Sequence, residues 1–134
     1  MKHLVLIVFF FSIAACSDGE LTNMHRLSNG AKLYKTNCAN CHQEKGEGLA
    51  RLMPPVMLSD WLLANMKELP CLIKNGSKQP MLVNGVLYKQ AMPSLSHLSD
   101  SEVKDICVFV AQKFGNLTFE QANVMFSDSL NSCN

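Results

Sequence analysis

The 134-residue chain lacks the length of apolar sequence that a helix needs to cross a bilayer. Its apolar start covers only residues 4–15, whereas a transmembrane helix takes about 20 such residues. The chain also has little net charge, +1 in total. Without residues 1–15, which include Lys2, 11 basic residues balance 11 acidic ones. This balance gives no indication of a nucleic-acid partner, and we expect net charge to steer partners only weakly.

Two further absences concern Cys38 and Cys41, which are separated by two residues. No second C-x-x-C and no H-x-x-x-H pair follows them, so the other half of a zinc site is missing. No βαβ pattern surrounds them, which argues against a thioredoxin-type redox pair. The next residue is His42, and the complete C-x-x-C-H motif is the signature of a covalently attached c-type haem.

The spacing of this motif suits the chemistry of attachment. Two thiols three residues apart on one helical turn can form thioethers to the two vinyl groups of one haem edge. His42 then lies below the ring plane, where its imidazole can bind the iron and fill one axial position. The sequence therefore predicts one covalent haem c, with Cys38 and Cys41 attached to it and His42 as an axial iron ligand.

The N-terminal region is typical of an exported bacterial lipoprotein. Residues 1–15 have a short basic start and an apolar stretch, as in a signal peptide. Their end, with Cys16, reads I-A-A-C and resembles a lipobox, so we expect a lipidated Cys16; the alternative is an ordinary signal peptide with an incidental cysteine. The residue after Cys16 is Ser17 and not Asp, which resembles the sorting signal of outer-membrane lipoproteins. We expect the periplasmic face of a membrane, the outer rather than the inner one, with residues 16–27 as the lipidated cysteine and its polar tether.

Hydrophobic periodicity then predicts a first helix that begins at an N-cap, Ser28, and runs into the haem motif. Gly30 costs this helix about 1 kcal/mol relative to Ala. It makes sense if another helix crosses closely there. Two helical pieces are expected between Leu58 and Asn75, separated by Pro70.

The second half of the chain carries stronger local signals. Asn84-Gly85 between two short apolar runs predicts a β-hairpin. Ser99 and Glu102 form a capping box ahead of an apolar stripe, which predicts the last core helix. Thr118 and Gln121 repeat the capping pattern and open a short final helix.

In this order, the elements of residues 28–116 resemble a class I cytochrome c of the small bacterial monohaem type. The shared features are the glycine-containing first helix, the C-x-x-C-H motif, Pro54-Pro55, Met92-Pro93 and the capped last core helix. The resemblance implies an all-α cytochrome c fold, with four or five helices around a covalent haem and one small hairpin before an axial methionine. Residues 117–134 form a C-terminal helical extension that the resemblance does not cover.

The resemblance also implies the second axial ligand of the iron, Met92, which lies on a non-helical segment before Pro93. His97 is the rival ligand, and the other methionines are expected to fill the core. A rigid carbonyl at Pro55 could accept a hydrogen bond from His42 Nδ1 and fix the ring. Arg51 could pair with a haem propionate, or be a solvated surface residue. Trp61 could also contact a propionate, through its indole N–H, or it could serve only in packing.

Cys71, Cys107 and Cys133 remain, and exported cysteines tend to pair. We expect a Cys71–Cys107 disulfide, because both residues lie on neighbouring predicted helices. Pairing of either with Cys133, or free buried thiols, are the alternatives.

The sequence thus predicts an electron carrier and not an enzyme, with redox proteins as partners, a lipid anchor in the membrane and no small-molecule substrate. Lys45, Lys78 and Lys89 could surround the exposed haem edge, or simply be solvated. One alternative is a haem subunit of a periplasmic redox enzyme complex, such as one for sulfur-compound oxidation or a terminal reductase. Another is a lipidated domain that recruits an enzyme to the membrane.

Overall fold

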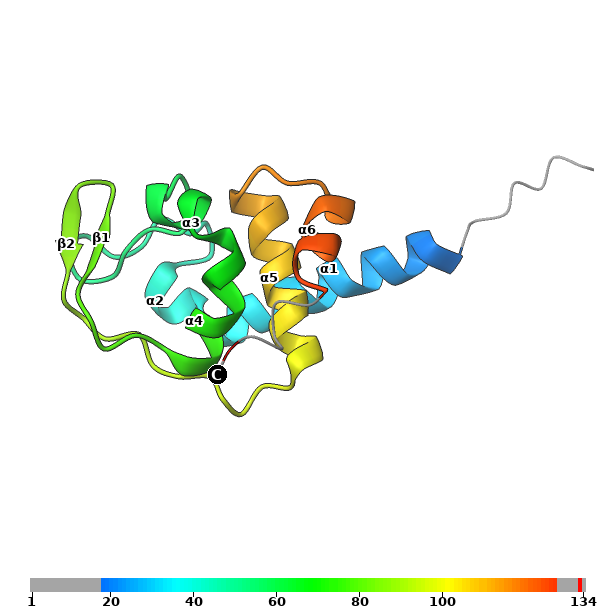
Figure 1. The fold of residues 1–134 in the computed structure, drawn as a ribbon, viewed down its shortest axis with the longest axis horizontal. Coiled ribbons are helices and arrows are strands. Elements are labelled where there is room, and N and C mark those ends of the chain that lie inside the picture. Colours follow the sequence, from blue (N-terminus) through cyan, green and yellow to red (C-terminus); the bar gives the residue numbers. More distant parts are fainter. Residues whose placement is uncertain (1–17, 128–132, 134) are drawn as a thin grey trace, which may run out of the picture.

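The computed structural model describes residues 18–127 and Cys133. The predicted signal peptide and lipidated Cys16 lie outside these residues. The described part contains six α-helices and one two-stranded sheet (Figure 1). No helix in that part is long and apolar enough to cross a membrane. The elements are α1 (Asp18–Asn37), α2 (Ala39–His42), α3 (Asp60–Ala64), the 3₁₀ turn η2 (Met66–Glu68), α4 (Leu69–Asn75), β1 (Met81–Val83), β2 (Val86–Tyr88), α5 (Asp100–Phe114) and α6 (Phe119–Met125).

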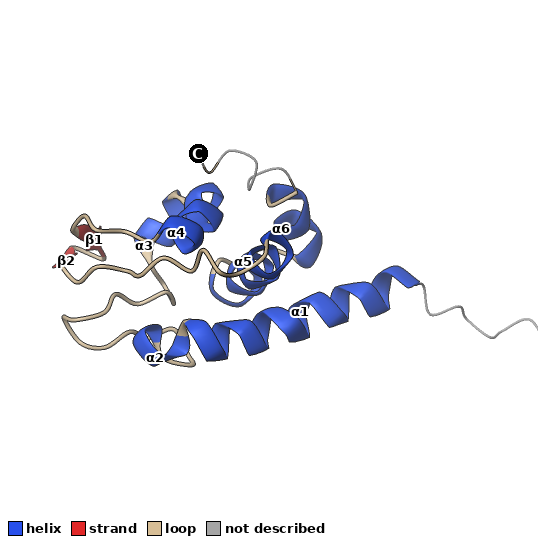
Figure 2. Cartoon of the chain, turned by 90° about the horizontal axis from the view of Figure 1, so that it is seen from below, coloured by secondary structure: helices blue, strands red, loops and turns tan. Residues whose placement is uncertain are grey.

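Helices α1 and α5 form the most extensive helix–helix contact, and α6 packs against α5 (Figure 2). The remaining short helices and the hairpin lie together at the other end of the molecule, beyond the end of α1 (Figure 1). Buried side chains of α5 form the centre of the core, and they include Val103, Ile106, Cys107 and Val110. The all-α expectation is therefore confirmed, with more helices than the four or five predicted.

The crossing of α1 and α5 depends on Gly30. A β-carbon at this position would lie 2.2 Å from the Asp105 carbonyl oxygen and 2.8 Å from the Phe109 β-carbon. Beside this contact, Asn29 Nδ2 donates to Asp105 Oδ2 at 2.8 Å. The expected close crossing at Gly30 is confirmed, and the absence of a side chain there is what allows it.

Helix α1 begins at Asp18, ten residues before the predicted start at Ser28. The prediction that a polar tether runs through residues 16–27 is therefore wrong from Asp18 onward. Contacts with α6 hold the last part of this added stretch, because Arg26 Nη1 donates to Asn123 Oδ1 at 3.2 Å. Leu27 packs against the core in the same region. The C-terminal extension thus packs as part of the domain.

Sequence patterns that involve only neighbouring residues predicted the other elements more reliably than the start of α1. Both capping boxes, at Ser99 and Thr118, are formed. In each, the side chain of the N-cap residue accepts from the backbone N–H three residues later, and the side chain of that later residue accepts from the N-cap backbone N–H. The hairpin turn has positive φ angles at Asn84 (49°) and Gly85 (75°), as a type I′ turn requires. Pro70 differs from its prediction, because it stands in the first turn of α4 instead of between two helices. Proline is tolerated there, since the first turn has no intrahelical use for its missing N–H.

The predicted Cys71–Cys107 disulfide is wrong. Cys71 is bonded to Cys133, across 62 residues of sequence. Cys71 lies on the half-buried side of α4, whereas Cys107 is completely buried on the core side of α5. Cys107 is therefore a free thiol, and burial raises its pKa well above the usual range. Pairing with Cys133 was among the alternatives that the sequence left open.

Gly30→Ala should lower the free energy of unfolding by about 1–3 kcal/mol, the usual cost of overpacking a core contact. Gly19→Ala is the matched control on the same helix, because a β-carbon there meets nothing within 4 Å. Denaturant unfolding followed by circular dichroism should show a loss for Gly30→Ala alone. Equal stability of the two variants would contradict the tight crossing.

Replacing Cys71 and Cys133 together by Ser should destabilise the domain by up to about 4 kcal/mol, from the restored chain entropy of a loop of this length. Without added reductant, mass spectrometry of the digested wild type should find the Cys71 and Cys133 peptides joined. Peptides joined through Cys107 instead would show that the pairing is different.

Candidate haem-binding site

A large cavity lies at the end of the described structure where α2, α4 and the hairpin meet. It measures about 960 Å³ when the open space at its mouth is included. Most of its wall is apolar, and α4 and α5 supply much of it through Leu69, Leu72, Ile73, Ile106 and Val110. The wall therefore excludes water from whatever the cavity holds.

The C-x-x-C-H motif forms one side of this cavity. Cys38, Cys41 and His42 all line it. The motif continues α1 almost without interruption, since Cys38 N donates to the Tyr34 carbonyl at 2.8 Å and His42 N donates to the Cys38 carbonyl at 2.9 Å. Tyr34 also lines the cavity, and its hydroxyl donates to the carbonyl of Gln43, which ends α2. The α1–α5 crossing thus fixes the motif in place.

The imidazole of His42 has a defined orientation and protonation state. Its Nδ1 lies 2.9 Å from the Pro54 carbonyl oxygen. A carbonyl can only accept, so Nδ1 carries the proton and Nε2 keeps a free lone pair. Burial lowers the pKa of His42, which favours the neutral ring that binds metals. The prediction of Pro55 as the partner is wrong by one residue.

Gly48 explains why the loop after the motif can bring the Pro54 carbonyl to His42. Its φ of +71° suits glycine, and a β-carbon there would lie 2.8 Å from both Pro54 C and Pro55 N. Its own N–H donates to the His42 carbonyl at 3.0 Å. The prolines therefore reach the histidine only because this position has no side chain.

Only some of the candidates for the second axial ligand line the cavity. Met53, Met81 and Met92 are the methionines that line it, and His97 is exposed and does not. Met53 directly precedes Pro54, so it belongs to the segment that supports His42. Met92 comes from a different segment, which is held to the end of α4.

Two backbone hydrogen bonds with Ser77, of 2.8 and 2.9 Å, fix the position of Met92. The approach depends on Gly76, where φ is +68° and a β-carbon would lie 2.4 Å from the Met92 carbonyl oxygen. Leu95 N adds a third bond to this segment by donating to the Ile73 carbonyl at 3.0 Å. The sequence did not predict this pairing.

The polar lining of the cavity was only partly predicted. Trp61 lines it, but Arg51 is exposed on the neighbouring loop and does not. No lysine or arginine is among the lining residues of the described structure. Neutral groups that the sequence did not single out, Ser77, Gln79 and Gln90, take their place. They lie near the ends of the hairpin, where no motif marked them.

These groups fit a haem: two thiols, an imidazole with a free Nε2, an available thioether and an apolar wall. Comparison with known proteins then decides the family. The family model "Cytochrome c" matches residues 27–113. The chain belongs to the cytochrome c family. It therefore has an all-α cytochrome c fold and a covalently bound c-type haem, which Cys38, Cys41 and His42 would hold.

Several characterised relatives in this family resemble the chain. It is 28% identical to cytochrome c6 of Cyanidium caldarium over 84% of the chain and 94% of that protein. It is 28% identical to cytochrome c-552 of Thermus thermophilus over 66% of the chain and 70% of that protein. The cytochrome c subunit of a quinone alcohol dehydrogenase from Gluconobacter oxydans is 34% identical over 65% of the chain. The match spans only 18% of that subunit's length.

Proposed function

We propose that this cytochrome c is an outer-sphere electron carrier whose iron is bound by His42 and Met92, and that it works at the periplasmic face of a bacterial membrane, attached through a lipid on Cys16. The observation that carries the redox role is the C-x-x-C-H motif, which lines an apolar cavity that also presents Met92. When bound, haem supplies an iron that cycles between the ferric and ferrous states.

The chain's own residues prepare the site for this role. The Pro54 carbonyl orients His42 and makes its Nε2 the iron-binding atom. Met92, held by Ser77, supplies a thioether, which raises the reduction potential relative to stronger donors. If His42 and Met92 both bound the iron, no position on it would be open to a substrate, and the chain would transfer electrons without performing a chemical reaction on a substrate.

A second candidate is a haem subunit of a larger periplasmic redox enzyme complex. The similarity to the cytochrome c subunit of the quinone alcohol dehydrogenase supports it. The present chain contains one C-x-x-C-H motif. In such a complex it would therefore provide one electron-transfer step, with redox proteins as neighbours on both sides.

The start of α1 bears on the proposed anchor. Asp18 is two residues after Cys16, and α1 then continues for 20 residues to the haem motif. At 1.5 Å per residue, this helix is about 30 Å long. A lipid on Cys16 would therefore be joined to the haem motif by a helix in place of the flexible tether that the sequence suggested.

The proposed iron ligand is tested with Met92→Ala. The ferric wild type should be low-spin and show the weak long-wavelength charge-transfer band of iron–thioether bonding. Met92→Ala should lose this band, have a lower reduction potential and bind cyanide or carbon monoxide readily, because one axial position is open.

Met53→Ala and Met81→Ala are the matched controls, since both residues line the same cavity. They should keep the band and lose only packing energy, and a His97 variant should behave like the wild type. If the band persists in Met92→Ala and disappears in one of the control variants, that methionine is the ligand. A high-spin wild type that binds carbon monoxide at once would favour haem catalysis over electron transfer.

The proposed anchor is tested with Cys16→Ser. Several acyl chains bury many methylene groups at about 0.8 kcal/mol each, so salt should not release the wild type from membranes. The variant should appear in the soluble periplasmic fraction after export. Unchanged membrane association in Cys16→Ser would show that the lipobox interpretation is wrong.

A further inference from the structure

Most of the exposed large apolar side chains of the described structure come from one stretch of the sequence, which includes the hairpin. Ten large apolar residues are exposed, and seven of them lie between residues 49 and 87. None of the seven lines the haem cavity, so haem binding does not account for them. They are Leu49, Leu52, Met57, Leu58, Leu63, Leu82 and Leu87.

The hairpin itself has two apolar sides. Its register places Leu82 opposite Leu87, and successive side chains of a strand point to opposite faces. Val83 and Tyr88 face inward, are 2% and 6% exposed, and line the cavity. Leu82 and Leu87 are 60% and 53% exposed. A solvent-facing side of an antiparallel sheet is usually polar, so this leucine pair is unexpected in a surface that contacts only water.

The hairpin is firmly attached to the body of the domain. At its turn, Asn84 and Asp60 exchange two hydrogen bonds between backbone N–H and side-chain oxygen, of 2.7 and 3.0 Å. Near its base, the Tyr88 hydroxyl donates to the Ala50 carbonyl at 3.4 Å. The hairpin is therefore a fixed surface, and only its own thickness separates that surface from the haem cavity.

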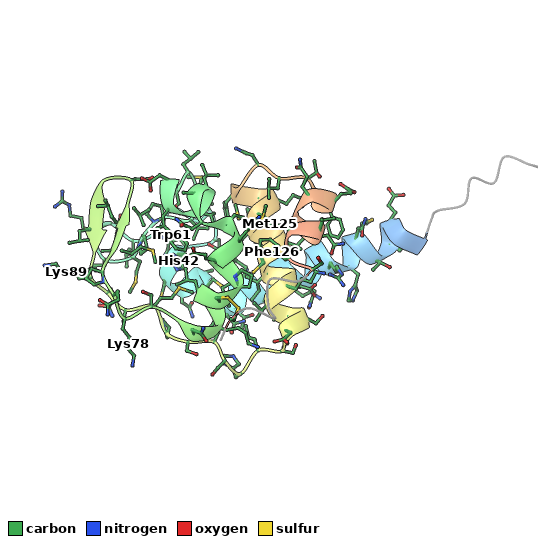
Figure 3. All side chains as sticks on the ribbon, viewed as in Figure 1. His42, Trp61, Lys78, Lys89, Met125 and Phe126 are labelled. Carbon is green, nitrogen blue, oxygen red and sulfur yellow. A yellow bond between two sulfur atoms is a disulfide. The ribbon has the colours of Figure 1, made fainter. Side chains whose placement is uncertain are left out.

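The segment that contains the hairpin carries only basic charge, although the exposed carboxylate of Asp60 lies at the hairpin turn. Residues 69–99 contain no Asp or Glu. Lys74, within that range, pairs with Asp100. Lys78 precedes the hairpin in the sequence and Lys89 follows it. Both are exposed, and neither forms an ion pair within the described residues. Figure 3 shows both of these side chains pointing outward at the hairpin end of the molecule.

We infer that Leu82, Leu87, Lys78 and Lys89, together the hairpin face, form the docking surface for a redox protein that presents acidic residues around an apolar centre. The inference rests on the proposed electron-carrier function. The leucines supply an apolar contact, and the lysines attract the acidic rim. One electron passes between the partner's redox centre and the haem, and no bond forms or breaks. The contact should be small and short-lived, as is usual for redox encounters.

The position of the hairpin face favours a protein over a membrane as its partner. The hairpin lies at one end of the molecule, and the first residues of α1 lie at the opposite end (Figure 1). A lipid on Cys16 would hold the α1 end toward the membrane. The hairpin face would then point away from the lipid, where an exported protein can reach it.

The test uses the haem-loaded protein and a small acidic blue-copper protein as the probe, with electron transfer followed by stopped flow. Leu82→Ser/Leu87→Ser should lower the second-order rate constant about tenfold, because the apolar contact is lost. Lys78→Glu/Lys89→Glu should lower it at least as much, and should abolish or reverse the decrease that the wild type shows with added salt.

Matched controls carry the same changes elsewhere on the surface. Leu21→Ser/Met24→Ser removes two exposed apolar side chains of α1, and Lys32→Glu/Lys67→Glu reverses two exposed lysines. Both controls should retain the wild-type rate with the copper protein to within about twofold, since these residues lie outside the hairpin face. Ferricyanide should oxidise the haem of every variant completely, which shows that the haem site is intact.

Several results would overturn the inference. One is equal rates for the hairpin variants and the controls, and another is a wild type that reacts with ferricyanide but not with the copper protein. Hairpin variants that lose only binding to anionic phospholipid vesicles would identify a membrane surface instead. Variants that only convert a dimer to a monomer in sedimentation would identify a second copy of this chain. A wild type whose haem does not exchange electrons with ferricyanide would contradict the proposed function itself.

Discussion

The close contact of α1 and α5 at Gly30 is the constraint on which the haem site depends. The C-x-x-C-H motif continues α1, so the position of α1 against α5 determines where Cys38, Cys41 and His42 lie. Helix α5 provides Ile106 and Val110 to the opposite wall of the same cavity. One helix crossing therefore positions both the attachment residues and part of the apolar surface against which the haem packs.

The second side of the site is built from separate, weaker contacts. Helix α4 lines the cavity, and its end is joined to the Met92 segment through Gly76 and Ser77. The disulfide between Cys71 and Cys133 links α4 to the C-terminal end of the chain. The segment that supplies the proposed thioether is thus supported by α4 and, through it, by the disulfide, whereas His42 is positioned by the α1–α5 crossing and by the nearby Pro54 carbonyl.

The distance along the sequence between interacting residues explains what could be predicted. The haem motif, the two capping boxes and the Asn84-Gly85 turn depend on residues within a few positions of one another, and the structure has all of them. The partner of Cys71 and the Ser77–Met92 pairing depend on contacts with distant segments, and a distant contact also holds the part of α1 just before Ser28. Arg26 reaches Asn123 and Cys71 reaches Cys133, and neither spacing follows a local rule. The error of one residue at Pro54 arose because either carbonyl of a Pro-Pro pair could face the histidine.

The central claim is that His42 and Met92 close the iron, which makes the protein an electron carrier. The most direct measurement is the proton NMR spectrum of the reduced, haem-loaded protein with isotopically labelled methionine. A methyl group bound to the iron lies over the haem ring, and the ring current shifts its resonance far upfield. The account predicts one such methyl resonance, assigned to Met92. A spectrum without it, or an assignment to Met53 or Met81, would contradict the account.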